Sequence, residues 1–495
     1  MVISMPGTEG DEREGSADQS LRTKWKGYHS IWLWLFLAWM MLYIERSITG
    51  PVVSWMIAND VAFMAAAPMP HALGGIIGSF FFAGYMLTQF PSGYLGDKWG
   101  HKIMIVISLV WSSVATFLSG VARDLTLFVS TRILTGLGEG AYYSNDRAFI
   151  CSHTPEEKKG MGLGIVFVGL AAGLTLATVL TPILLDSAAS MMGKESAWSF
   201  PFLLFSLPTL LLAAIIWKWV GPKEPMGKLL RAGSRLVLYA AIFLVVLMGA
   251  YLGTLHLGLD SVAQASFMLL AVFALVAVIY GRLGLRSNRA LRDRNLLIVY
   301  LSAIPILYTL WFFGFWAVLV ISESSKLGIS GAAVYAALFG VASAIGYPLG
   351  GRICDAVRTK ENRKKLYIIL TLAVALMVFL VAVAISIHLD VLLFGLLIFA
   401  IGAVFSAAQT AHMTLTADLA PRENLGQAFG MWNLVGEVGA VLSPVVSGVL
   451  RDATGDWTLA IMVNGALLIV SAVLVGVVRT GDRPAFVPGA AGDRR

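Results

Sequence analysis

The segment Gly93–Lys102 reads GYLGDKWGHK and joins two apolar stretches that centre near Gly84 and Trp111. A membrane-spanning helix needs about 20 mainly apolar residues, and stretches of this kind recur along all 495 residues of the chain. The chain is 58% hydrophobic and 13% charged, too apolar to cover itself with polar surface in water. The segment therefore predicts a short polar turn between two helices of an all-α integral membrane protein.

About fourteen apolar stretches are long enough to cross a bilayer. The loops on one side carry clusters of lysine and arginine within 98–102, 223–235, 282–294 and 352–365, whereas the opposite loops carry few. Cytoplasmic loops are enriched in these residues, so we expect both termini in the cytoplasm and a cell membrane location, the bacterial inner membrane first. An even number of spans agrees with this orientation.

A second copy of the polar turn occurs half a chain later. Gly351–Asp355 reads GRICD and repeats the G-x-aliphatic-x-D pattern of Gly93–Asp97. Two parallel halves with a substrate site between them are one known carrier architecture. We expect an N-terminal tail (1–28), a six-helix half (29–222), an inserted two-helix hairpin with basic flanks (223–294), a second six-helix half (295–480) and a C-terminal tail (481–495). The hairpin is predicted to be a peripheral packing or assembly element rather than part of the transport path.

The turn Gly93–Lys102 resembles the signature loop of the major facilitator superfamily, and Gly351–Asp355 resembles a degraded second copy. His101 stands where that loop usually carries a cation. The resemblance implies two pseudo-symmetric six-helix halves that open a central cavity alternately to each side of the membrane. It also implies a gating role at the cytoplasmic side for Gly93, Asp97, Lys98, Gly100 and Asp355.

Within that superfamily, four stretches are similar to the anion:cation symporter family: Tyr43–Arg46, Gly78–Pro91, Arg132–Glu139 and Gly426–Gly455. This resemblance implies proton-coupled symport of a small organic anion, such as a sugar acid. The chain departs from the family at Glu45, where an aspartate is usual, and directly after Glu139, where the usual Ala-Pro is replaced by Gly-Ala.

Four charged residues lie inside predicted spans of the first half, where each costs about 3 kcal/mol on insertion scales. We expect Arg46 and Arg132 to bind the substrate carboxylate, because a guanidinium is a planar, permanently charged fork that suits bidentate recognition. Glu139 is seven residues after Arg132, which returns it to nearly the same helix face. Glu139 is the preferred proton-coupling acid, because competition with the substrate for Arg132 would link binding to protonation. Glu45 is the second candidate.

Glu437 lies midway along a span of the second half, where the family pattern does not require an acid. It would serve as a second protonation site, as a counter-ion to an arginine or as a contact for a substrate amine; an acid in a polar vestibule is the alternative. Neutral hydrogen bonds to the substrate are expected from Tyr85, Gln89, Asn145, Gln409 and Asn433.

The motifs that would indicate other functions are absent. The chain has no G-x-x-x-x-G-K-[ST], H-E-x-x-H, paired C-x-x-C or G-x-S-x-G, so we expect neither ATP hydrolysis nor an enzyme, and no metal or cofactor. Protons, a small carboxylate and the lipid bilayer are the expected partners, with no nucleic acid.

One alternative function is export of a lysolipid, amphiphile or drug, because the pair Glu45-Arg46 and the stretch Gly138–Tyr142 also resemble spinster-type lipid carriers. Such a carrier should have an apolar portal open to lipid. The other is a membrane sensor that does not transport.

Overall fold

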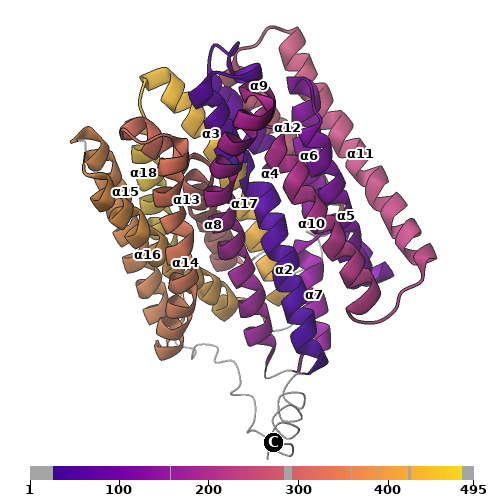
Figure 1. The fold of residues 1–495 in the computed structure, drawn as a ribbon. Helices are drawn as coiled ribbons and strands as arrows, with labels where there is room; N and C mark the ends of the chain where they lie inside the picture. The colour runs from indigo at the N-terminus through magenta and orange to yellow at the C-terminus, as the bar shows by residue number, and fades with distance from the viewer. Residues whose placement is uncertain are drawn as a thin grey trace, which may run out of the picture.

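The computed structural model describes residues 26–155, 158–283, 293–357, 359–387, 389–421 and 425–481, and these form a bundle of long helices (Figure 1). The predicted tails at 1–25 and 482–495 lie outside the described residues, as does most of the basic segment 282–294.

The first half of the chain forms helices that run up and down the bundle. They are α2 (Gly27–Ser47), α3 (Thr49–Asn59), α4 (Pro70–Trp99), α5 (His101–Gly120), α6 (Leu125–Glu139), α7 (Tyr143–His153), α8 (Lys159–Met192) and α10 (Phe200–Trp219). Two short helices, η1 (Ala62–Met64) and α9 (Lys194–Ala197), lie in the loops. We call the end of the bundle with the α4–α5 turn the Gly100 end, and the end with the α3–α4 loop the Asp60 end.

The hairpin and the second half follow in the same up-and-down order. The hairpin is α11 (Met226–His256) and α12 (Ser261–Leu283). The second half comprises α13 (Arg294–Ser324), α14 (Ile329–Ala356), α15 (Lys360–Ser386), α16 (Val391–Leu419), α17 (Leu425–Thr454) and α18 (Thr458–Gly476). In Figure 1 these orange and yellow helices stand beside the indigo and magenta helices of the first half.

Twelve helices in the described part of the chain are long and apolar enough to cross a membrane, with α2 and α3 counted as one. The 15 residues of α6 are fewer than a full span, because the chain turns at 140–142 before it continues as α7. The sequence predicted about fourteen spans; α6 and α12 are the two expected spans that are not among these twelve. The chain is therefore a multi-pass, all-α membrane protein of the predicted architecture.

The most extensive contacts between the halves are made by two helix pairs: α4 packs along α17, and α8 packs along α14. The contact of α4 with α17 depends on glycine. A Cβ on Gly75 would lie 2.3 Å from the carbonyl oxygen of Pro444, and a Cβ on Gly448 would lie 2.2 Å from that of His71. Small residues of this kind let membrane helices approach backbone to backbone. These close contacts keep the two halves together toward the Asp60 end.

The hairpin lies against the first half and also reaches the second. Helix α11 packs on α4, α5 and α6, with Ala232, Leu236 and Ala240 among its buried residues, and it forms one edge of the bundle in Figure 1. Helix α12 packs on α4 and on α17. The hairpin thus contacts the junction between the halves.

Candidate functional site

A buried ion pair joins α2 to the end of α6. Arg46 donates from Nη2 and Nε to Oε2 of Glu139, over 2.9 and 3.0 Å, and at most 1% of either side chain is exposed. Arg46 lies two residues before the break between α2 and α3, and Glu139 is the last residue of α6. Removing one partner from a buried pair of this kind leaves an uncompensated charge and typically costs about 3–5 kcal/mol.

Glu45 is held beside this pair by hydroxyl groups of α5. Its Oε2 accepts hydrogen bonds from Ser112 Oγ at 2.7 Å and from Thr116 Oγ1 at 3.0 Å. Ser112 Oγ also lies 3.4 Å from Oε1 of Glu139. A hydroxyl has one proton to donate, so Ser112 can donate to only one of the two glutamates at a time. The serine thus lies between the two carboxylates that were predicted from the sequence to accept protons.

Aromatic rings surround the guanidinium of Arg46. Its carbon Cζ lies 4.2 Å from the ring centre of Tyr85 and 4.6 Å from that of Tyr43, and 5.8 Å from that of Trp311. A cation over an aromatic face is stabilised by the negative charge density of the ring. Tyr43 and Tyr85 belong to the first half and Trp311 to the second, so the cation lies where the halves meet.

Arg132 is fully buried and is held by hydroxyl groups. Its Nη2 donates to Ser119 Oγ at 2.6 Å and to Thr135 Oγ1 at 2.8 Å, and its Nη1 donates to Thr49 Oγ1 at 3.3 Å. Within the described part of the chain, no carboxylate forms an ion pair with it. Arg132 and Glu139 both belong to α6, as their spacing predicted, and Glu139 forms its ion pair with Arg46 of α2. Arg132 therefore supplies positive charge that no neighbouring carboxylate neutralises by direct contact.

The second half contributes an acid and amides to the same region. Glu437 of α17 is 4% exposed, interacts electrostatically with Arg46, and has an Oε2 with no hydrogen bond to a described residue. One turn earlier, Asn433 Nδ2 donates to Gln89 Oε1 at 3.1 Å, across the junction of the halves. Gln409 accepts a hydrogen bond of 2.7 Å from Tyr347 within the second half. Of the predicted polar residues, Tyr85, Gln89 and Asn433 thus lie at the junction with Arg46 and Glu437.

Asn145 lies with the signature turn rather than with Arg46. Its Nδ2 donates to the carbonyl oxygens of Ser92 and Ala141, and its Oδ1 lies 2.9 Å from His101 Nδ1. It fastens α7 to the α4–α5 turn at the Gly100 end.

The predicted gating residues form that turn. Gly100 has a φ of +114°, a conformation that residues with a Cβ rarely adopt. The Asp97 side chain is 78% exposed and lies 3.5 Å from His101 Nε2, while Lys98 lies over the ring of Trp99. Gly93 packs on Ser144, and Asp355 of the second half is exposed.

Two further buried ion pairs were not predicted from the sequence. Arg363 Nη1 contacts both carboxylate oxygens of Asp418, at 2.9 and 3.0 Å, at the Gly100 end of the second half. Asp146 and Arg147 pair on α7, and Arg147 lies over the ring of Tyr143. The signal for the second pair was present in the sequence, because adjacent opposite charges follow the span of Glu139 directly.

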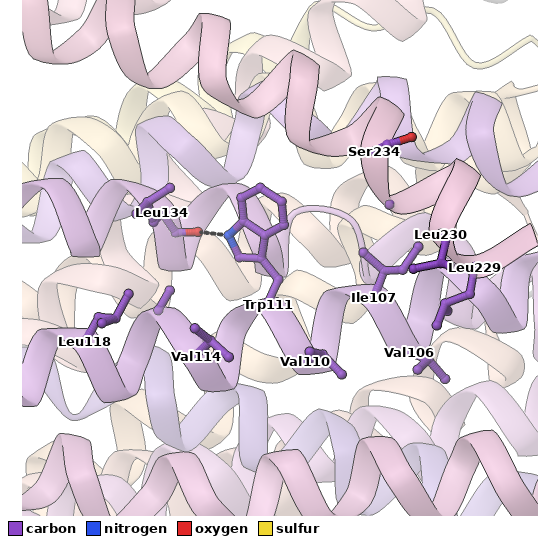
Figure 2. A pocket seen from close by; sticks show the side chains of 12 residues that line it. Val106, Ile107, Val110, Trp111, Val114, Leu118, Leu134, Leu229, Leu230 and Ser234 are labelled. Carbon is purple, nitrogen blue, oxygen red and sulfur yellow. Dashed lines mark hydrogen bonds between the residues drawn. The ribbon is translucent and has the colours of Figure 1, made fainter. Parts of the chain in front are cut away.

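An apolar groove opens on the side of the bundle, between α5, α6 and α11 (Figure 2). It holds about 500 Å³ and its lining includes Val110, Trp111, Val114, Leu134 and Leu230, with no charged residue. Its one drawn hydrogen bond runs from Trp111 Nε1 to the carbonyl oxygen of Leu134, over 2.9 Å. The groove shares no lining residue with the Arg46 region. Elsewhere in the described residues, no group of three or more His, Cys, Asp or Glu side chains is placed to hold a metal ion.

Two helical halves with ion pairs and aromatic residues buried where they meet define a membrane protein of the carrier type. The family model of the Major Facilitator Superfamily matches residues 35–337 and 313–493. The chain therefore belongs to the Major Facilitator Superfamily, as the signature turn predicted.

Curated relatives are similar over part or most of the chain. A probable chloroplastic anion transporter of Oryza sativa subsp. japonica is 32% identical over 155 residues, which cover 30% of this chain and 28% of that protein. A probable sulfoacetate transporter of Cupriavidus necator is 25% identical over 81% of this chain and 83% of its own. A probable galactarate/D-glucarate transporter of Bacillus subtilis is 22% identical over 90% of this chain and 89% of its own.

Solved structures share the fold. The crystal structure of a D-xylose-proton symporter aligns with a TM-score of 0.64 and 16% identity, over 92% of this chain and 98% of that one. A bacterial homologue of the human lysosomal transporter Spinster, in an inward-facing and occupied conformation, aligns with a TM-score of 0.68 and 14% identity, over 92% and 97%. At these identities the likeness concerns the fold alone.

Proposed function

We propose that the chain is a secondary active transporter that carries a small organic anion, a sugar acid or other carboxylate, together with protons by alternating access. The observation that carries this proposal is the Arg46–Glu139 pair with Glu45 linked to it through Ser112. It places a carboxylate-binding fork in direct contact with a protonatable acid. The anion transporters among the relatives support the same substrate class.

The proposed coupling is an exchange of partners on Arg46. A substrate carboxylate takes the two donor nitrogens that Glu139 now occupies, and Glu139, released from its cation, accepts a proton. Ser112 then turns its hydroxyl from one glutamate to the other, so that either Glu45 or Glu139 can carry the transported proton. Because substrate and proton each favour the other's binding, the coupling is reciprocal.

The remaining residues of the junction set specificity in this proposal. Arg132 contributes a second positive charge, which offsets part of the negative charge of Glu45 and Glu437 when Arg46 and Glu139 neutralise each other. Glu437, with its free carboxylate oxygen, accepts a hydrogen bond from a substrate hydroxyl or amine. The neutral groups of Tyr85, Gln89, Asn433 and Gln409 donate and accept around the body of the substrate. No covalent chemistry and no cofactor are needed.

The orientation in the membrane is also part of the proposal. The positive-inside rule places the Gly100 end, with its lysine and arginine clusters, in the cytoplasm together with both termini. The cell membrane of a bacterium is the proposed location. The signature turn from Gly93 to Gly100 and the exposed Asp355 then act at the cytoplasmic gate.

A second candidate function is export of a lysolipid or other amphiphile. The apolar groove between α5, α6 and α11 favours it, because hydrocarbon enters an uncharged lateral groove without displacing water from polar groups. The buried charges around Arg46 favour the anion, since a hydrocarbon chain gives them no partner.

The test is proton flux into liposomes that contain the purified protein and a pH-sensitive dye. A panel of sugar acids, other carboxylates, amino acids and lysolipids is added to the wild type and to Glu139→Gln. We expect a carboxylate to drive proton entry in the wild type and not in the variant. Glu361→Gln, at an exposed carboxylate, is the control and should behave as the wild type. Proton movement with a lysolipid and with none of the acids would overturn the anion assignment.

A further inference from the structure

A second cluster of titratable groups lies at the Asp60 end, far from Arg46. His71 is the second residue of α4, about 21 Å along that helix from Tyr85 at about 1.5 Å per residue. Its Nδ1 lies 2.6 Å from Asp452 Oδ1 of α17, and its Nε2 lies 2.9 Å from Glu323 Oε1 of α13. One imidazole therefore ties a helix of the first half to two helices of the second.

The two carboxylates are themselves held in place. Asp452 accepts a second hydrogen bond, of 2.8 Å, from the backbone N–H of Ala72. Glu323 Oε2 accepts from Arg451 Nε at 2.8 Å and from Trp457 Nε1 at 3.0 Å. His71 and Asp452 have side chains that are 8% and 9% exposed, against 25% for Glu323. Glu323 is thus the more exposed of the two carboxylates that contact the imidazole.

With both carboxylates ionised, these two contacts call for a proton on each ring nitrogen. Ionised carboxylates only accept hydrogen bonds, so a ring that contacts one through Nδ1 and another through Nε2 donates from both and is an imidazolium. The described charged groups that face it are Glu323 and Asp452, with Arg451 bound to the glutamate. With the imidazolium the four groups are neutral in sum; with a neutral ring they carry one net negative charge, and one carboxylate loses its donor.

The cluster sits where the halves must separate. Gly448 of α17 packs directly on the backbone of His71, and the ring of Trp316 lies 6.2 Å from the imidazole. When a carrier of this fold opens toward the Asp60 end, the halves rock apart there. That movement separates the imidazole of His71 from both carboxylates and exposes it to water.

We propose that His71, Glu323 and Asp452 form a proton-binding latch that closes the Asp60 end when the imidazole is protonated and releases it when the proton leaves. The latch is a proton site separate from Glu45 and Glu139. Of the proposed function it needs only alternating access, and it holds whatever the substrate is. In the proposed orientation the Asp60 end faces the outside, so a proton bound to His71 from that side closes this end after the substrate has entered.

The experiment measures the distance across the Asp60 end by double electron–electron resonance in reconstituted protein. Cys151 and Cys354 are not disulfide-bonded and are first replaced by serine. Spin labels go on the exposed positions Ala66 and Lys326, and spectra are taken between pH 5 and 9 without substrate. A second pair, at Ser152 and Ala356, reports the Gly100 end.

We expect the wild type to populate the short distance at low pH and to gain a long one as pH rises. The ratio of the long-distance to the short-distance population should change by about tenfold, which corresponds to a difference of about one pH unit in the proton affinity of the two states. His71→Gln and Glu323→Gln should each abolish this response, and the Ser152–Ala356 pair should move in the opposite sense. His153→Gln, at an exposed histidine of the Gly100 end, should respond as the wild type.

A pH response in both His71→Gln and Glu323→Gln that equals the wild type's would overturn the latch. The readout contains no substrate, so it does not depend on the proposed function. If no acid drives proton entry in the liposome assay but the distance still changes with pH, the proposed function fails and the latch stands. If uptake is proton-coupled but the distance does not change with pH, the latch fails and the proposed function stands.

Discussion

The guanidinium Nη2 of Arg46 lies 2.9 Å from Oε2 of Glu139, and each residue belongs to a helix that is interrupted close by. Helix α2 gives way to α3 at Ile48, and α6 ends at Glu139 itself. Interrupted helices are the usual place for binding sites in carriers, because their free backbone groups and small local shifts are available there. Separating Arg46 from Glu139 would therefore allow the chain to shift at both interruptions at the same time.

Replacing Arg46 with lysine should weaken substrate binding while the protein still folds. Lysine keeps the charge but loses the planar fork that contacts Glu139 and the ring faces of Tyr43 and Tyr85. We expect the dissociation constant of the carboxylate, measured by calorimetry in detergent, to rise about tenfold or more, as the loss of about 1.4 kcal/mol gives. Unchanged affinity would show that the carboxylate binds elsewhere.

Ser112→Ala should slow proton-coupled uptake and spare exchange of substrate for substrate. The change removes the one hydroxyl shared by Glu45 and Glu139, and a hydrogen bond to a charged group is worth about 1.5–3 kcal/mol. Ser113→Ala is the matched control, because that neighbour donates to the carbonyl oxygen of Ser206 instead. Equal loss of uptake and exchange in Ser112→Ala would contradict a role in proton transfer.

Gly448→Ala should hold the Asp60 end open. A Cβ there would lie 2.2 Å from the carbonyl oxygen of His71, so the halves cannot close without a shift of backbone. Gly430→Ala, on the same helix with nothing within 4 Å of the new Cβ, controls for the gain of about 1 kcal/mol in helix propensity. Thiol labelling of Ala66→Cys in the cysteine-free background measures the opening and should rise in Gly448→Ala alone.

Asp418→Asn should destabilise the protein without touching the transport site. It breaks the buried bidentate contact with Arg363, for which about 3–5 kcal/mol is the usual cost. We expect a lower melting temperature in detergent, with substrate affinity per folded molecule unchanged. A fall in affinity at full stability would place this pair in the transport path instead.

Gly233→Leu tests the amphiphile alternative. The new Cβ would meet only Ile107 Cδ1, at 3.9 Å, and Gly233 lines the groove of Figure 2, so the added side chain occupies part of that groove. If amphiphiles bind there, the variant should lose lysolipid binding in a fluorescence titration and keep carboxylate-driven proton flux. Retained lysolipid binding would exclude the groove as its site.

The charged residues of the site could be found from the sequence, but their pairing could not. Glu45, Arg46, Arg132 and Glu139 are recognisable because each is costly within an apolar stretch. Helix periodicity placed Glu139 near Arg132, and both do lie in α6. It could not show that Glu139 makes its ion pair with Arg46 or that hydroxyl groups hold Arg132, because Arg46, Thr49 and Ser119 lie on other helices.

The cluster around His71 was harder to predict. Polar residues at the ends of spans are ordinary, since they lie near water whether or not they meet. The contact of His71 with Glu323 and Asp452 spans more than half of the chain. It exists because glycines let α4 and α17 touch at that end, which only the assembled bundle reveals.

Helix α12 touches both α4 and α17, and this contact makes the two halves mechanically unequal. The hairpin is held mainly by the first half, through α4, α5 and α6, so it moves with that half. Whenever α17 moves relative to α4, the contact of α12 with α17 has to shift, and a residue change on that contact acts on the movement of the halves rather than on the substrate site.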